Sequence, residues 1–172
     1  QPRSRGLGDV YKRQVQRHEI KRVEDWIPHM QKLGVNAVYF SPVFESDTHG
    51  YNTRDYRKID VRLGTNEDFK EVCDALHRAG IRVVLDGVFS HTGSDSRYFN
   101  REGRYGDGGA YRDPSSPYRS WYDFDPKYKG GYRSWWGFET LPEVNEETPS
   151  YVEFITGPGG VIDTWLRRGA AG

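Results

Sequence analysis

The sequence lacks paired cysteines, an excess of either charge and long apolar runs. Cys73 is the only cysteine among 172 residues, so no disulfide can form within the chain, and we expect a cytoplasmic location. Lys and Arg together number 25, and so do Asp and Glu. Nucleic-acid-binding proteins usually carry a basic patch, so this balance predicts no nucleic-acid partner. No apolar run reaches the roughly 20 residues of a membrane-spanning helix, which predicts no membrane partner.

The ends of the chain are unusual. It begins with Gln1 rather than Met and stops at Gly172 directly after a helical pattern, so we expect it to be part of a longer protein. The first fourteen residues show neither helical nor strand periodicity and resemble translated adaptor sequence. A native flexible basic leader is the alternative. In both cases residues 1–14 are excluded from the prediction of the fold.

Two helix-strand pairs follow. Apolar residues recur at three- and four-residue steps over 18–33, which predicts an amphipathic helix with a kink or a restart at Pro28. The β-rich segment 35–40 predicts a buried strand. A long polar stretch up to Gly64 shows no sustained period.

A second helix is predicted over 65–79, with Thr65 and Asp68 in capping-box spacing. The apolar segment 81–86 then predicts a second buried strand. Strand, crossover helix and strand form a β-α-β unit, whose strands are almost always parallel.

Aromatic residues dominate the next part of the chain. Of 25 aromatic residues, 14 lie between Tyr98 and Tyr151. Disordered segments are poor in aromatic residues, so we interpret 94–150 as an inserted subdomain rather than as a disordered loop. Helical patterning returns after Tyr151, with a glycine-rich break at 157–160.

Candidate site residues lie on the loops that leave the two predicted strands, where ligands bind in repeating β-α proteins. One loop carries His49 and Tyr51 on either side of a glycine, and the other runs from Asp86 to His91. A buried carboxylate needs a partner, so a structural ion pair is favoured over a catalytic role for Asp86. His91 either caps a turn or contacts a ligand, and its position favours the ligand.

These segments carry a resemblance to glycoside hydrolase family 13, the α-amylase family. The chain is similar to this family from about residue 15 to its end, in three ordered motifs: GVNAVYFSPVF at 34–44, HGY at 49–51 and DGVFSH at 86–91. LPEVN at 141–145 and YRSWWGF at 132–138 resemble the neopullulanase, cyclomaltodextrinase and amylopullulanase branch.

The resemblance implies an α/β fold, an incomplete (β/α)8 TIM barrel with about strands two and three, helices one to three and an inserted irregular domain B. It divides the chain into 15–86 as partial barrel, 87–150 as domain B and 151–172 as the third barrel helix region, ending before the fourth strand.

The resemblance also implies site roles. Tyr51 would stack on a glucose ring, and His49 and His91 would hydrogen-bond the hydroxyls of that sugar. Asp86 would pair with an arginine of the fourth strand. Most rings of domain B are expected to form its core, and the best candidates for sugar contact are Trp135 and Trp136.

Relatives commonly have Asn at the position of Ser90, where it helps to bind a structural calcium ion. A serine hydroxyl is a weaker calcium ligand, so we expect no metal there, and the chemistry that the resemblance implies requires no cofactor. Relatives are retaining enzymes that use a carboxylate nucleophile and a carboxylate acid/base about 5 Å apart. Both would lie beyond Gly172, so no catalytic residue is assigned and the chain alone is expected to be inactive.

Three functions remain open for the parent protein. The first is hydrolysis of α-1,4 or α-1,6 links in maltodextrin, cyclodextrin, pullulan or starch. The second is glucosyl transfer or isomerisation, as in glucanotransferases and trehalose synthases. The third is non-catalytic carbohydrate binding, which the presence of His49, Tyr51 and His91 argues against. The branch also implies a possible homodimer. Because barrel strands are left without neighbours, we expect the isolated chain to be poorly soluble or partly molten.

Overall fold

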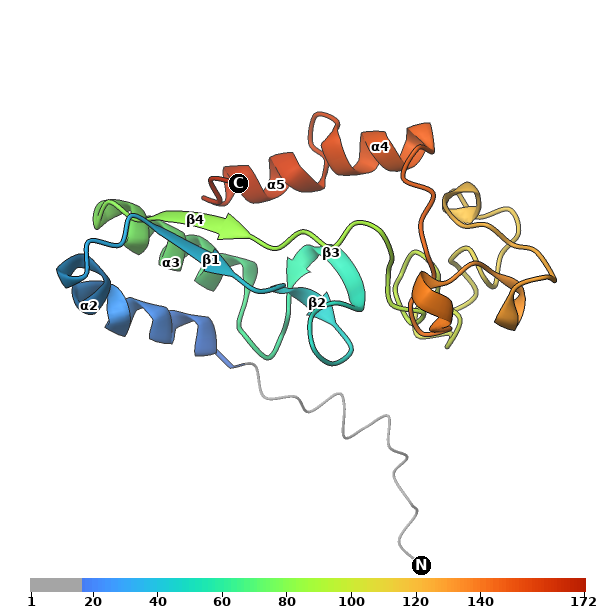
Figure 1. Cartoon of the computed structure of the whole chain (residues 1–172), viewed down its shortest axis with the longest axis horizontal. Helices are drawn as coiled ribbons and strands as arrows, with labels where there is room; N and C mark the ends of the chain where they lie inside the picture. The colour runs from blue at the N-terminus through green and yellow to red at the C-terminus, as the bar shows by residue number, and fades with distance from the viewer. Residues whose placement is uncertain (1–16) are drawn as a thin grey trace, which may run out of the picture.

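The computed structural model describes residues 17–172. The predicted leader, residues 1–14, lies outside the described residues. Figure 1 shows strands and helices at one end of the molecule and an irregular segment at the other. Two further helices lie above the strands in that view and lead to the C-terminus.

The first predicted helix consists of two pieces. A 3-10 helix, η1 (Glu19–Trp26), is followed directly by α2 (Ile27–Lys32). Pro28 lies in the first turn of α2, where its missing N–H costs nothing and its fixed φ suits a helix start. The restart predicted at Pro28 is therefore present.

The predicted β-α-β unit is confirmed. β1 (Ala37–Phe40) pairs in parallel with β4 (Arg82–Leu85), and α3 (Asn66–Arg78) connects them. The capping box is complete: the Asp68 N–H donates to Thr65 Oγ1 across 3.0 Å, and the Thr65 N–H donates to Asp68 Oδ2 across 2.8 Å. These bonds satisfy backbone donors that a helix start leaves without partners.

The polar stretch before Gly64 contains a hairpin that the sequence did not predict. β2 (Phe44–Ser46) pairs antiparallel with β3 (Thr53–Ile59), with register shifts on both sides of Glu45. Such irregular pairing disturbs the two-residue alternation by which a strand is recognised.

The final helices flank the predicted glycine break. They are α4 (Pro149–Thr156) and α5 (Val161–Arg167). Beyond α5 the backbone runs along β4: the Ala171 N–H donates to Val83 O across 2.7 Å, and the Leu85 N–H donates to Gly172 O across 2.9 Å. The helices end at Arg167, and residues 171–172 lie at the edge of β4.

The segment between β4 and α4 contains short 3-10 turns and isolated bridges instead of long strands. The turns are η2 (Arg119–Trp121), η3 (Lys129–Gly131) and η4 (Trp135–Gly137). Its core consists mainly of rings, and the buried ones are Tyr98, Phe99, Trp121, Tyr122 and Tyr132. Edge-to-face contacts join many of them, an arrangement that suits the electrostatics of aromatic rings.

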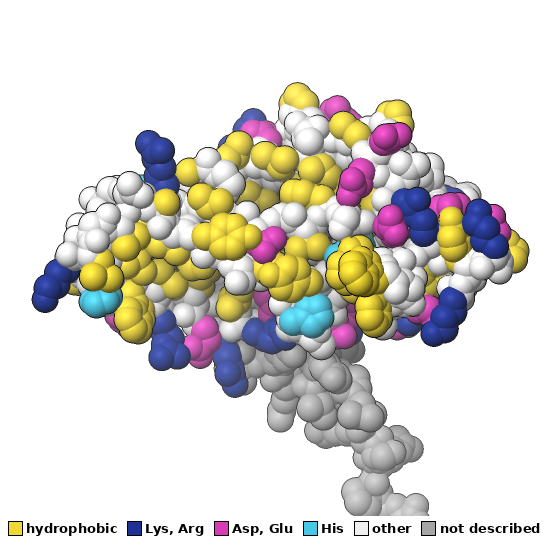
Figure 2. Space-filling view, in the orientation of Figure 1, with side chains coloured by type: hydrophobic (Ala, Val, Ile, Leu, Met, Phe, Trp, Pro, Cys, Tyr) yellow, Lys and Arg dark blue, Asp and Glu magenta, His cyan; other side chains and the backbone are white. Residues whose placement is uncertain are grey.

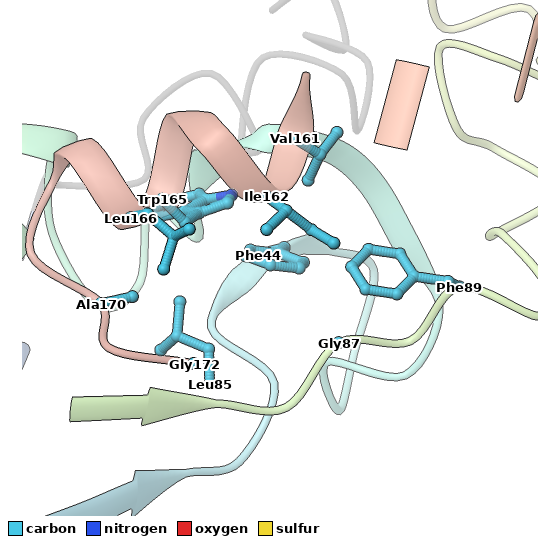
Figure 3. A pocket seen from close by; sticks show the side chains of 10 residues that line it. All are labelled: Phe44, Leu85, Gly87, Phe89, Val161, Ile162, Trp165, Leu166, Ala170 and Gly172. Atoms are coloured by element: carbon cyan, nitrogen blue, oxygen red, sulfur yellow. The ribbon is translucent and has the colours of Figure 1, made fainter. Parts of the chain in front are cut away.

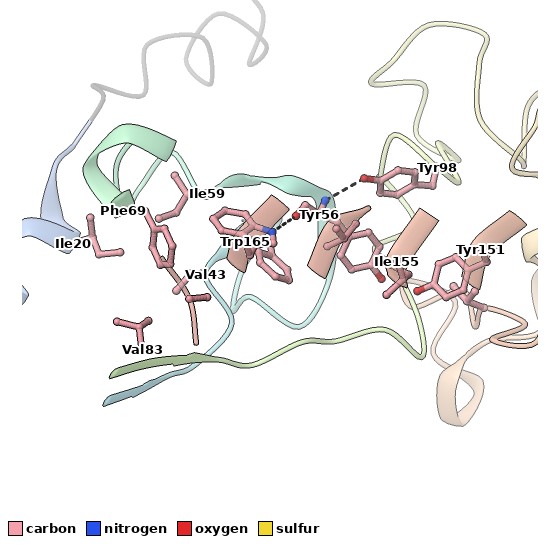
Figure 4. Packing of buried hydrophobic residues seen from close by; sticks show 14 of the residues in the cluster. Ile20, Val43, Tyr56, Ile59, Phe69, Val83, Tyr98, Tyr151, Ile155 and Trp165 are labelled. Carbon is pink, nitrogen blue, oxygen red and sulfur yellow. Dashed lines mark hydrogen bonds between the residues drawn. The ribbon is translucent and has the colours of Figure 1, made fainter. Parts of the chain in front are cut away.

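Tyr56 of β3 joins the two ends of the molecule (Figure 4). Its ring is fully buried. Its backbone N–H donates to the Tyr98 hydroxyl across 3.1 Å, and its carbonyl accepts from Trp165 Nε1 across 2.7 Å. Side chains thus satisfy buried backbone groups that a neighbouring strand would otherwise pair.

Candidate functional site

A pocket of about 680 Å³ opens between the loops that leave β1 and β4 and the irregular segment. It has the position that β-α proteins use for ligands, beyond the carboxyl ends of the strands. It is lined by Asp47, Thr48, His49, Tyr51, Asn52, His91, Trp135, Phe138, Thr140 and Leu141. Four of the six predicted site residues therefore line one pocket.

Tyr51 lies at the centre of this arrangement, with three groups bonded to it. Its backbone N–H donates to His49 Nδ1 across 3.2 Å, and its carbonyl lies 2.8 Å from His91 Nε2. Its hydroxyl donates to Asp86 Oδ2 across 3.4 Å. Tyr51 is 44% exposed, so an aromatic residue lies at the wall of the pocket while remaining accessible.

The His49 side chain is exposed beside Tyr51, with ring centroids 5.9 Å apart. Because Nδ1 accepts from a backbone N–H, its lone pair is engaged and the proton of a neutral ring lies on Nε2. Nε2 is thus the ring atom that can donate to a ligand in the pocket.

His91 is buried, and its ring lies 5.4 Å from that of Trp135. Burial lowers the pKa of His91, against the opposing effects of the Tyr51 carbonyl and Glu143. This lowering favours the neutral form of the ring. Ser90 Oγ lies 3.1 Å from Nδ1, so both ring nitrogens of His91 have protein partners.

Two buried hydroxyls position the loop that carries His91. The Tyr56 hydroxyl lies 2.9 Å from Val88 O and 3.1 Å from His91 O, and the Tyr151 hydroxyl donates to Phe89 O across 2.7 Å. Burial raises the pKa of both tyrosines, which keeps them protonated as donors. Sequence reasoning did not assign them a role, because only the fold shows which carbonyls they reach.

Asp86 lies outside the pocket lining and is joined to it through Tyr51. Hydrogen bonding and charge from the nearby Asp86 carboxylate, together with partial desolvation, raise the pKa of Tyr39. Within residues 17–172, no Lys or Arg side chain forms an ion pair with Asp86, and its side-chain hydrogen-bond partner is the Tyr51 hydroxyl. The pairing with a fourth-strand arginine stays a prediction.

The two predicted tryptophans differ in position. Trp135 lines the pocket against His91, whereas Trp136 lies outside the lining and is 83% exposed. Trp136 has φ 53° and ψ 24°, a left-handed conformation that is rare for a bulky residue. Phe138, which lies in the same motif but was not selected from the sequence, also lines the pocket.

Figure 2 shows one face of the molecule, on which hydrophobic side chains gather around histidine and acidic side chains. Of the carboxylates near the pocket, Asp47 is ion-paired with Arg54. Among residues 17–172, no group of three or more His, Cys, Asp or Glu side chains is placed to hold a metal ion.

A second hollow, of about 360 Å³, lies between β4 and α5 (Figure 3). Phe44 and Phe89 form one part of its wall and Trp165 and Leu166 another. Ligand pockets need a few convergent polar groups to orient a ligand, and the side chains lining this hollow are apolar. It therefore does not compete with the first pocket as a sugar site.

Within residues 17–172, no helix has the length and apolar character to cross a membrane.

Comparison with known proteins agrees with this geometry. The family described as "Alpha amylase, catalytic domain" matches residues 17–165. An amylopullulanase of Thermoanaerobacterium saccharolyticum is 43% identical over 162 residues, and a cyclomaltodextrinase of a Bacillus species is 37% identical over 162 residues. The matches cover 86% and 87% of this chain but only 12% and 26% of those relatives.

Among solved structures, the type III pullulan hydrolase of Thermococcus kodakarensis superimposes with a TM-score of 0.73 at 31% identity. That match covers 88% of this chain and 26% of the hydrolase. The sequence resemblance and the expectation of an incomplete barrel are confirmed, with two parallel barrel strands and no closed barrel among the described residues. The chain belongs to the α-amylase catalytic-domain family.

Proposed function

We propose that this chain forms the sugar-binding front part of an enzyme that hydrolyses α-1,4 or α-1,6 links in α-glucans. The observation that carries the proposal is Tyr51, an exposed aromatic residue at the pocket wall whose main-chain N–H, carbonyl and hydroxyl are all hydrogen-bonded. The names of the relatives support it, since they include amylopullulanase, cyclomaltodextrinase and oligo-1,6-glucosidase. The chain spans 12% of the amylopullulanase, so the activity of the whole protein, here called the complete enzyme, is part of the proposal.

In this proposal Tyr51 stacks on a glucose ring, and His49 donates from Nε2 to a sugar hydroxyl. His91 forms the neighbouring wall. Its Nε2–H donates to a sugar hydroxyl, which either displaces the Tyr51 carbonyl or shares the hydrogen bond with it. Trp135 extends the apolar surface. The nucleophile and the acid/base are supplied from outside residues 17–172, so the chain binds and orients the sugar and performs no bond cleavage itself.

Calcium binding at Ser90 does not fit the donor set. Calcium prefers six to eight oxygen ligands from carboxylates, carbonyls and water. The Ser90 hydroxyl instead faces the imidazole of His91. We therefore propose a site without calcium at this position. The homodimer and the cytoplasmic location stay predictions.

The test is hydrolysis of maltotriose and pullulan by the complete enzyme, with and without Tyr51→Ala. We expect release of reducing ends by the wild type and a KM about tenfold higher in the variant, the size of effect that losing about 1.4 kcal/mol of binding gives. Tyr111→Ala is the matched control, because Tyr111 is 40% exposed, a fraction similar to the 44% of Tyr51, but lies outside the pocket. No hydrolysis by the wild type, or equal effects of the two variants, would overturn the proposal.

A further inference from the structure

Asp47 is a carboxylate of the pocket wall to which the proposed function gives no role. Its side chain is 48% exposed, whereas the side chain of Arg54, with which it is ion-paired, is 12% exposed. The hydrogen bond between them uses one carboxylate oxygen of Asp47, Oδ1. Within residues 17–172, no protein group donates a hydrogen bond to the other oxygen, Oδ2. A charged acceptor atom at the pocket wall is therefore left without a protein donor.

The backbone on both sides of Asp47 is held by hydrogen bonds. Ser46, the last residue of β2, is buried, and its N–H donates to Asp60 Oδ2 across 3.0 Å. On the other side, the Thr48 N–H donates to Asn52 Oδ1 across 3.3 Å. The main chain at Asp47 is therefore fixed at the point where the pocket loop leaves β2.

The guanidinium of Arg54 orients the side chain of Asp47. Its Nε donates to Asp95 Oδ2 across 2.6 Å, and its Nη1 donates to the Ser46 carbonyl across 3.1 Å. Asp95 belongs to the irregular segment, and its side chain is 12% exposed. A guanidinium carries its donors in a rigid planar fork. These two bonds therefore determine the position of Nη2, the atom that donates to Asp47.

Neutralising the charge of Arg54 does not account for Asp47. A buried charge needs a partner, and Asp95 supplies one on the buried side. Arg104 also approaches Asp95, at 3.5 Å, but its side chain is 42% exposed, so solvent screens its charge. The ion pair between Asp47 and Arg54 is open to solvent on the Asp47 side, and exposed ion pairs add little to stability. The contribution of Asp47 is therefore to be sought in the pocket.

We propose that Asp47 is a sugar-binding residue that accepts a hydrogen bond from a glucan hydroxyl at Oδ2, and that Arg54 is the positioning residue that orients it. The role of Asp47 in sugar binding rests on the proposed function. His49, two positions further along the same loop, offers a donor at Nε2. Because a hydroxyl group both donates and accepts hydrogen bonds, the loop presents one acceptor and one donor to the hydroxyls of a bound glucan.

The first experiment measures KM and kcat of the complete enzyme with maltotriose for Asp47→Ala. We expect KM to rise about tenfold, more than kcat falls, because substrate binding loses a hydrogen bond to a charged acceptor. Asp74→Ala is the matched control: the Asp74 side chain is 44% exposed and ion-paired with Lys70, and Asp74 does not line the pocket. An unchanged KM in Asp47→Ala, or an equal rise in Asp74→Ala, would overturn the proposal.

The second experiment tests whether Arg54 acts through Asp47. Arg54→Lys keeps the charge but lacks the planar fork, so we expect KM to rise about threefold when Asp47 is present. In the Asp47→Ala background the same substitution should change KM by less than about 1.5-fold, since the two residues act as one unit. An equal rise in both backgrounds would show an effect through Asp95 or the backbone instead. That result, or an unchanged KM in both backgrounds, would overturn the positioning role.

The proposed function and the role of Asp47 fail in different ways. If the wild-type enzyme does not hydrolyse maltotriose, the proposed function is overturned and the role of Asp47 with it. If the wild type hydrolyses maltotriose and Tyr51→Ala raises KM while Asp47→Ala does not, the role of Asp47 alone is overturned.

Discussion

The hydroxyl of Tyr51 donates to Asp86 across 3.4 Å, a bond between residues 35 positions apart. It joins the loop between β2 and β3, which follows β1 in the chain, to the end of β4, and β1 and β4 are the two parallel strands of the fold. The parallel pairing of these strands places their carboxyl ends at one edge, so that an aromatic side chain from one loop reaches the carboxylate that follows the other strand.

The bond to Asp86 predicts that two substitutions of Tyr51 weaken binding of maltotriose to different degrees. In the complete enzyme, Tyr51→Phe keeps the ring and loses only the bond to Asp86, so affinity for maltotriose should fall about threefold, within the net value of one hydrogen bond. Tyr51→Ala also removes the ring and should cost about tenfold. Calorimetric titration of both variants measures the difference, and equal losses would show that the ring itself contributes nothing.

Trp136 provides a second prediction, based on its left-handed backbone. Such a conformation costs a residue with a Cβ about 1–2 kcal/mol and costs glycine little. Trp136→Gly should therefore be more stable than Trp136→Ala by about 1 kcal/mol, although glycine normally weakens a chain through the entropy of its unfolded state. Urea unfolding of the two variants of the complete enzyme tests this. If Trp136→Gly were less stable than Trp136→Ala, backbone strain at this position would be contradicted.

If Trp136 contacts sugar, both of these variants should bind maltotriose more weakly than the wild type. Wild-type affinity in both would leave its exposed indole without a role in binding.

A third prediction concerns pH. Burial opposes ionisation of Asp68, but hydrogen bonds from Thr65 and His18 outweigh it and lower the pKa of Asp68. A carboxylate with a lowered folded pKa stabilises the fold above its unfolded pKa of about 3.9 and loses this effect as pH falls through the folded pKa. Asp68→Ala should therefore be less stable than wild type at pH 7 by about 1–2 kcal/mol. This difference should shrink below about pH 4.

Unfolding of wild type and variant at several pH values measures the Asp68 contribution. Asp74→Ala is a control on the same helix, since Asp74 forms an exposed ion pair with Lys70 and does not cap the helix. A stability difference for Asp68 that is constant between pH 7 and pH 3 would contradict the assignment.

The fourth prediction concerns residues 17–172 alone. Large apolar side chains such as Trp26, Leu33 and Tyr39 are exposed, and the apolar hollow beside α5 is open. Since a partial barrel leaves strand edges and apolar faces without neighbours, the isolated chain should show no sharp thermal transition and should bind a hydrophobic dye. A cooperative transition in calorimetry would contradict this expectation.

The fifth prediction concerns calcium. If Ser90 is not a calcium ligand, any rise of melting temperature with calcium should be the same in wild type and Ser90→Ala, because ligand binding stabilises the fold only through the residues that bind it. Thermal scans with added calcium and with a chelator measure this. A calcium-dependent rise that disappears in Ser90→Ala would place the ion at Ser90.

The sequence predicted those elements whose signals are local. The Thr65–Asp68 capping box and the apolar stripe of α3 lie within one helix, and the observed helix agrees with the predicted one. The β2–β3 hairpin was not predicted, since its pairing is irregular around Glu45. The resemblance identified His49, Tyr51 and His91, but the bond between Tyr51 and His91 joins residues 40 positions apart. No local pattern encodes such a contact, so it required the structure.

The three attachments of Tyr51 have a thermodynamic consequence. Immobilising a flexible side chain on binding costs about 0.5–1.5 kcal/mol of conformational entropy. In the proposed function, a ring-shaped ligand meets a Tyr51 ring that folding has already restricted, so much of this cost falls on folding instead. Loop stability and ligand affinity are thereby coupled. A substitution that loosens the loop at 49–51 should weaken binding even when the substituted residue never touches the ligand.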